Sequence, residues 1–166
     1  MTHETPRAFN VLVGAATVHD GSFLLLRRSA RESFLPDAWG IPAGQMLYAE
    51  DPTDACLREL HEETGLHGEI IELIGYSMFR SRRAGTALSN VQLNFLVHVD
   101  DDKVKLNYNS HSECCWISLE DTESELVDAF TRDIMSSVRE HFKGLGARAN
   151  LSTIEYRRTA TGRKHT

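Results

Sequence analysis

The stretch GQMLYAEDPTDACLRELHEETGL, residues 44–66, carries three glutamates at helical spacing, closely followed by a glycine. Glu59, Glu62 and Glu63 stand at positions i, i+3 and i+4, so in a helix their carboxylates lie on one face. Like charges at these spacings repel by roughly 0.2–0.5 kcal/mol per pair, and the stretch contains no lysine to offset them. A divalent cation would offset the repulsion, because hard ions such as Mg²⁺ and Mn²⁺ bind carboxylate oxygens. The stretch therefore predicts a helix with a metal-binding face.

The two ends of this helix are also readable from the sequence. Asp51 can cap the N-terminus, and Pro52 fits the first helical position, which needs no N–H. Gly65 fits the left-handed position after the last turn, and Leu66 can pack beyond it. The apolar side of the helix consists of Ala55, Cys56 and Leu60.

The spacing of the whole stretch matches a known pattern. Gly44 is followed by five residues, Glu50, seven residues and then the run Arg58-Glu59-Leu60-His61-Glu62-Glu63-Thr64-Gly65-Leu66. This resembles the Nudix box, G-x5-E-x7-R-E-U-x-E-E-x-G-U with U apolar, at every defined position. A solvated acidic helix is the alternative interpretation, and it leaves the glycines and the arginine unexplained. The resemblance implies an α/β fold, the Nudix-type α/β/α sandwich with a mixed β-sheet.

The resemblance also implies a set of metal ligands. It assigns Glu59, Glu62 and Glu63 to a Mg²⁺ ion, with Mn²⁺ as an alternative, and makes Glu50 a secondary ligand or an orienting group. Many members have glycine where this chain has Ala43. The ligand expected from that position is the backbone carbonyl, which the change to alanine retains.

Two further roles in catalysis follow from the resemblance. Arg58 is expected to pair with a glutamate and lock the loop before the helix. The attacking water needs a general base, and Glu59 and Glu113 both remain candidates. Glu113 is chosen because the family often places a glutamate just before the tryptophan found here as Trp116, and His111 is the second choice in that segment.

Candidate substrate-binding residues lie before the box. Arg28 ends a predicted strand, where the family often uses an arginine to reach substrate. Phe34 and Trp39 belong to the following loop, and aromatic rings there can stack on a base. The alternatives are a solvated strand end for the arginine and loop anchors for the aromatic residues.

Residues 80–86 form a predicted basic hairpin loop. Arg80 and Arg82 are candidates for a phosphate or leaving-group contact, because the guanidinium fork suits phosphate oxygens. A solvated turn is the alternative.

The remaining pattern predicts further strands and one more helix. The predicted strands cover residues 11–18, 22–28, 69–79, 91–99 and 111–119, with a short one at 104–108. The apolar run at 24–26 indicates burial on both faces, whereas the alternation at 91–99 indicates burial on one. An amphipathic helix is predicted from the stripe Leu126, Phe130, Ile134 and Val138.

Length and composition predict one domain. We assign residues 1–8 to a flexible N-terminus, 9–143 to a Nudix domain and 144–166 to a basic tail with five Arg and Lys residues against one glutamate. A net charge of −6 argues against a nucleic acid polymer as partner. Without a long apolar run or signal-like start, and with three unpatterned cysteines, we expect a cytoplasmic chain that avoids membranes. A homodimer is an open alternative.

The expected reaction follows from the box. It is Mg²⁺-dependent hydrolysis of a phosphoanhydride bond in a nucleoside diphosphate linked to another moiety, with release of a nucleoside monophosphate. Nucleoside triphosphates and nucleotide sugars are the expected substrates. The alternative is a non-catalytic Nudix domain that senses a nucleotide. A prenyl diphosphate isomerase is disfavoured, because Cys56 inside the box helix is badly placed for that chemistry.

Overall fold

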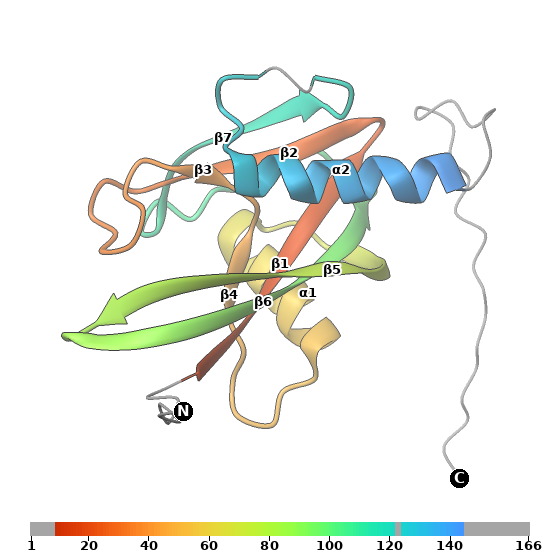
Figure 1. Ribbon diagram of the computed structural model, residues 1–166. Coiled ribbons are helices and arrows are strands. Elements are labelled where there is room, and N and C mark those ends of the chain that lie inside the picture. The colour runs from red at the N-terminus through yellow and green to blue at the C-terminus, as the bar shows by residue number, and fades with distance from the viewer. Residues whose placement is uncertain (1–8, 122–123, 145–166) are drawn as a thin grey trace, which may run out of the picture.

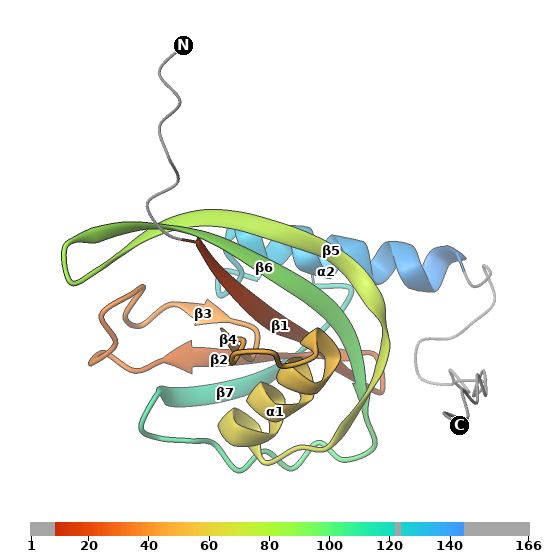
Figure 2. The ribbon, with the colours of Figure 1, turned by 90° about the horizontal axis from the view of Figure 1, so that it is seen from below.

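The computed structural model describes residues 9–121 and 124–144. Its elements are β1 (Phe9–His19), β2 (Ser22–Arg28), β3 (Trp39–Gly40), β4 (Ala43–Gln45), α1 (Pro52–Thr64), β5 (Gly68–Arg83), β6 (Thr86–Val99), β7 (His111–Ser118) and α2 (Ala129–Gly144). The strands form one sheet, and α1 and α2 cover opposite faces of it (Figures 1 and 2). The predicted α/β sandwich is confirmed. The predictions for residues 1–8 and for most of 144–166 lie outside the described residues.

The sheet is mixed, as predicted. Its strand order is β3-β2-β1-β6-β5, with β4 paired to β1 and β7 paired to β2. The long central pair of β1 and β6 is parallel, whereas every other pair is antiparallel. Neither helix in the described part of the chain is long and apolar enough to cross a membrane.

The two hairpins differ in what determines their turns. The turn at residues 20–21 follows from its local sequence, whereas the turn at residues 84–85 follows from strand pairing. Asp20 and Gly21 have φ angles of 44° and 75°, the conformation that a tight hairpin turn requires and that an Asp-Gly pair adopts readily. The prediction of a loop over residues 80–86 is wrong. Strand β5 continues through Arg83, which pairs with Thr86, and the turn contains only Ala84 and Gly85. The pairing along β6 extends the strand through a sequence that lacks apolar alternation.

The sheet separates two apolar cores. Leu24 and Leu26 pack on the α1 side and Leu25 packs on the α2 side, so the predicted burial on both faces is confirmed. Strand β6 differs from its predicted one-sided burial. Its opposite face holds buried polar side chains, among them Gln92 and Asn94, whose amides are joined by a 2.8 Å hydrogen bond. Mutual hydrogen bonding lets these amides lie away from water.

Two segments depart from the predicted secondary structure. Residues 104–108 form no strand. Instead, Lys105 N–H donates to Thr64 O at 2.7 Å and Asn107 N–H to Glu63 O at 2.9 Å, so this segment caps the C-terminal end of α1. Helix α2 begins at Ala129 rather than near Leu126, because the Asp128 carboxylate caps it by accepting from Thr131 N–H at 2.7 Å.

Candidate active site

Helix α1 begins and ends where the sequence predicts. The Asp51 side chain accepts from Thr53 N–H at 2.8 Å, and Gly65 adopts a φ of 70° while its N–H donates to His61 O at 2.8 Å. The predicted apolar side is buried against the sheet. Packing on one face therefore fixes the direction in which the box carboxylates project.

Gly44 of strand β4 lies in close contact with the carboxylate of Glu59. A Cβ atom added to Gly44 would lie 2.1 Å from Glu59 Cδ, so only glycine leaves room for the acid in this position. Burial raises the pKa of Glu59, and the charge and hydrogen bond of Arg58 partly oppose that rise. Glu59 is thus held in a confined space at the end of β4.

Arg58 binds the loop and the helix together. Its Nε and Nη2 atoms donate to Glu50 at 2.7 and 3.0 Å, and Nη2 also donates to Gln45 O at 3.1 Å. Its Nη1 atom donates to Glu59 at 2.7 Å and lies 3.3 Å from Glu62 Oε2. This geometry fits the loop-locking role expected for Arg58.

Glu63 lies apart from this arginine. It is 9% exposed, and Ala43 N–H donates to its Oε2 atom at 3.1 Å. Burial raises the pKa of Glu63 to about 8. His111 Nε2 lies 3.8 Å from Glu63 Oε1, and burial together with the charge of Arg28 lowers the pKa of His111 to about 4. No lysine or arginine of the described residues pairs with this buried acid.

The donor set suits a hard divalent cation, although the side chains are not arranged around one. No three His, Cys, Asp or Glu side chains in the described ranges converge as a metal cluster, and Arg58 forms ion pairs with both Glu59 and Glu62. The available donors are all oxygens, which is the ligand type that Mg²⁺ and Mn²⁺ select. The buried Glu63 is the observation that most favours a cation here, because no lysine or arginine of the described residues forms an ion pair with it and the more distant charge of Arg28 opposes the rise in its pKa only in part.

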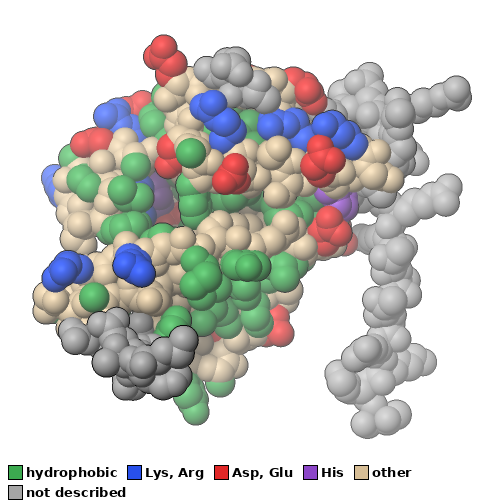
Figure 3. All heavy atoms as spheres, viewed as in Figure 1, with side chains coloured by type: hydrophobic (Ala, Val, Ile, Leu, Met, Phe, Trp, Pro, Cys, Tyr) green, Lys and Arg blue, Asp and Glu red, His purple; other side chains and the backbone are tan. Residues whose placement is uncertain are grey.

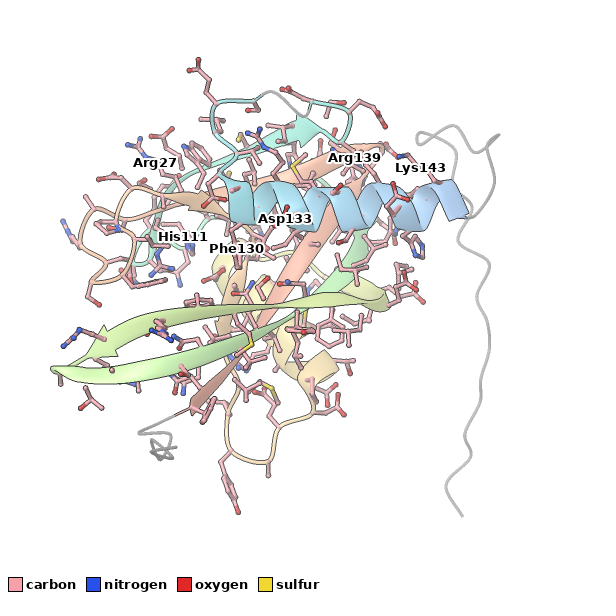
Figure 4. All side chains as sticks on the ribbon, in the orientation of Figure 1. Arg27, His111, Phe130, Asp133, Arg139 and Lys143 are labelled. Atoms are coloured by element: carbon pink, nitrogen blue, oxygen red, sulfur yellow. The ribbon has the colours of Figure 1, made fainter. Side chains whose placement is uncertain are left out.

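An aromatic cavity of about 190 Å³ adjoins the box. Ala43, which bonds Glu63, and His111, which lies against it, both contribute to the cavity wall. Phe34 stacks on Phe79 with ring centroids 5.5 Å apart. Figure 3 shows the hollow, and Figure 4 shows His111 and Phe130 beside the start of α2. Flat aromatic walls of this kind suit a flat ring such as a nucleobase.

Three of the five predicted substrate residues meet in this cavity. Arg28, Phe34 and Trp39 all line it. Arg28 also donates to Phe34 O at 2.8 Å and pairs with Glu32 at 2.9 Å, so it holds the loop that forms one wall. Arg80 and Arg82 are exposed on β5 and are not part of the cavity wall.

Sequence reasoning missed several residues of the cavity. The sequence pattern places Phe79 in a strand and Phe130 in a core stripe, and it gives Gln92 no role, yet all three line the cavity. One signal in the sequence points to this part of the cavity. Asn90, Gln92 and Asn94 alternate with apolar residues along β6. A strand face that is exposed to solvent usually carries some charged side chains, so a face with uncharged amides alone indicates a buried polar surface.

The two residues considered near Trp116 lie in different surroundings. Glu113 is exposed and accepts a 2.5 Å hydrogen bond from Arg27. His111 is buried and lies beside Glu63 and the cavity. The structure thus brings His111, the second choice, to the box, whereas Arg27 holds Glu113 away from it.

The structure is thus a three-layer α/β sandwich in which a helix bearing carboxylates lies beside an aromatic cavity. The family model of the NUDIX domain matches residues 7–138. An RNA pyrophosphohydrolase of Acidiphilium cryptum is 34% identical over 128 residues, which are 68% of this chain and 76% of that protein. Another, from Xylella fastidiosa, is 30% identical over 122 residues, 65% of this chain and 62% of that relative.

A solved structure agrees with these sequence matches. The crystal structure of a MutT protein from Methanosarcina mazei has a TM-score of 0.66 and 28% identity, over 83% of this chain and 99% of that one. The chain therefore belongs to the Nudix family of hydrolases, as the spacing of its box predicts. Members of this family generally use divalent metal ions.

Proposed function

We propose that this Nudix hydrolase cleaves a phosphoanhydride bond in a nucleoside diphosphate linked to another moiety and releases a nucleoside monophosphate. The position of Ala43 is the observation that carries the proposal. This residue lines the aromatic cavity and also donates its N–H to the buried Glu63. A base in the cavity would therefore have its phosphates beside the box carboxylates.

The residues proposed to hold the metal are Glu59, Glu62 and Glu63, with Glu50 and the Ala43 carbonyl as further oxygen donors. A bound Mg²⁺ or Mn²⁺ would neutralise phosphate oxygens and lower the pKa of a water molecule. Arg58 forms two hydrogen bonds with Glu50. These bonds can fix the loop by themselves, so Glu59 and Glu62 could leave Arg58 and bind the metal.

Glu59 is the better-supported candidate for the general base. Its side chain lies against β4 and is itself one of the proposed metal ligands, and burial raises its pKa, which strengthens it as a base. Glu113 is less well supported, because its carboxylate is bound to Arg27.

Nucleoside triphosphates and nucleotide sugars remain the first proposed substrates. A second candidate is the 5′-terminal triphosphate of RNA, which contains the same kind of bond. Its support is the 34% identity to a protein named an RNA pyrophosphohydrolase. A nucleotide sensor without activity is the alternative, and the intact box argues against it.

A metal-dependence experiment tests the proposal. Purified protein with Mg²⁺ is expected to release a nucleoside monophosphate from a nucleoside triphosphate or nucleotide sugar, and excess chelator is expected to stop this. Glu62→Gln should abolish turnover. Turnover that persists with chelator, or in the Glu62 variant, would refute the assigned metal site.

A further inference from the structure

Residues 9–121 and 124–144 leave part of the sheet face on the α1 side uncovered. Figure 2 shows α1 across one end of β1 and β6, with the end near the β5–β6 hairpin open. Phe9, Val11, Tyr76 and Met78 lie on this open part and are 57%, 43%, 70% and 64% exposed. Val11 of β1 and Met78 of β5 both pair with Val91 of β6, so the three side chains lie in one row across the sheet. These residues therefore form one apolar surface across three strands.

Two arginines extend the same surface. Arg80 and Arg82 follow Met78 at steps of two along β5, so their side chains project from the same face. Arg80 is level with Phe9, because both pair with Ser89. Both arginines are exposed, and no ion pair joins either to another described residue.

We call this surface the hairpin face and define it as Phe9, Val11, Tyr76, Met78, Arg80 and Arg82. None of its residues is acidic, nor are the β6 residues Ala87, Ser89 and Val91 that lie between them. The chain as a whole has a formal charge of −6. The hairpin face is thus a basic and apolar area on an acidic protein, so the net charge that argues against a nucleic acid partner does not describe this face.

This charge distribution disfavours a second copy of the chain as the partner. In a two-fold dimer the same patch meets itself. The two arginines would then be buried against a surface that offers no carboxylate, and unpaired buried charges are costly. An anionic partner that also presents flat apolar groups satisfies both the arginines and the exposed rings.

We propose that the hairpin face binds single-stranded RNA. Nucleobases stack on exposed aromatic side chains such as those of Phe9 and Tyr76, and phosphates accept hydrogen bonds from arginine. Phe79, which lines the cavity, projects from β5 on the opposite face to Met78 and Arg80. A strand whose 5′ end lies at the box can therefore cross the edge strand β5 onto the hairpin face. The position of that 5′ end rests on the second substrate class of the proposed function, whereas binding itself requires no turnover.

The test uses the full chain and a fluorescent single-stranded RNA. The RNA has a 5′-hydroxyl, so it contains no phosphoanhydride bond to be cleaved. Its length of about 12 nucleotides is within the range that one single-strand-binding domain covers. Fluorescence anisotropy is expected to show binding that weakens as salt rises. The double variant R80Q/R82Q should bind more weakly, and its slope of log K against log salt should be smaller by about 1.4, since each single-strand phosphate contributes about 0.7. Tyr76→Ala should weaken binding roughly 5- to 150-fold without a change in slope.

The matched control removes two cations from other faces. The variant K103Q/K143Q alters the net charge equally, and both lysines are exposed, so its salt slope should equal that of the wild type. Circular dichroism confirms that each variant is folded. An equal loss of slope in both double variants would show general electrostatics and overturn the proposal.

Three other results would also overturn the proposal. These are no RNA binding at low salt, binding to anionic vesicles in place of RNA, and a dimer in light scattering that dissociates in the Tyr76 variant while RNA binding is unchanged. RNA binding that follows these predictions in a chain without hydrolase activity would support the hairpin face and refute the proposed function.

Discussion

Arg58 holds Glu50 through the Nε and Nη2 atoms of its guanidinium, at 2.7 and 3.0 Å, across the loop that joins β4 to α1. The same arginine touches Glu59 and Glu62 through a third nitrogen. The hydrogen bonds to Glu50 first, and then the hydrogen bond and charge of Glu59, raise the pKa of Arg58, so it is charged throughout the accessible pH range. The Arg58 side chain thus fixes the conformation of the loop and places a positive charge within the box itself.

Arg58→Lys should reduce activity more than stability. Lysine keeps the charge but cannot form the two parallel bonds to Glu50. We expect Mg²⁺ affinity or kcat/KM to fall roughly 10- to 100-fold, the range typical when a group that orients metal ligands is lost. Arg31→Lys on the exposed loop is the control. Wild-type kinetics in the Arg58 variant would contradict the locking role.

Gly44→Ala should displace Glu59. The added Cβ would lie 2.1 Å from Glu59 Cδ, and the flexible carboxylate must move rather than the backbone. We therefore expect a large loss of turnover with a small change in the melting temperature. Gly144→Ala, where an added Cβ meets nothing within 4 Å, is the control for the substitution itself. A variant that retains full turnover would show that the position of Glu59 is not needed.

Glu113→Gln should leave kcat within about threefold of the wild type, because a general base contributes roughly 10²–10⁴-fold and Arg27 already engages this carboxylate. Steady-state kinetics at several pH values make the comparison. A loss of a hundredfold or more would restore Glu113 as the base and exclude the role proposed for Glu59.

Cys56 should make the protein less stable at high pH. Burial raises the pKa of its thiol from 9.0 to about 12, so between these values the folded state retains a proton that the unfolded state loses. The free energy of unfolding then falls as pH rises above 9, by up to about 1.4 kcal/mol per pH unit. Cys56→Ala lacks this contribution. Urea unfolding at pH 8 to 10 should therefore show the stability difference between wild type and variant shrinking, and a constant difference would contradict the assignment.

Local signals predicted the box helix well. The cap at Asp51, the left-handed Gly65 and the buried apolar side each depend on a few neighbouring residues, and the structure confirms all of them. The extent of the β5–β6 hairpin depends instead on pairing across strands, which is why the basic run at Arg80, taken by itself, predicts a loop.

The cavity could not be predicted because its walls come from distant parts of the chain. Phe34, Phe79 and Phe130 are brought together only by the sheet and α2. The choice between His111 and Glu113 depended on a bulge. Arg27 pairs with Glu113 but Arg28 pairs with His111, so the register shifts by one residue there. Simple alternation would place both side chains on one face.

The most direct test of the proposed function is the chromatographic measurement of products from a substrate panel with Mg²⁺. The panel contains nucleoside triphosphates, nucleotide sugars, dinucleoside polyphosphates and RNA with a 5′-triphosphate. The account predicts that at least one nucleotide yields a nucleoside monophosphate, or the RNA a 5′-monophosphate, with Glu62→Gln inactive on the same substrate. Nucleotide binding without turnover of any member of the panel would contradict it and identify the chain as a sensor.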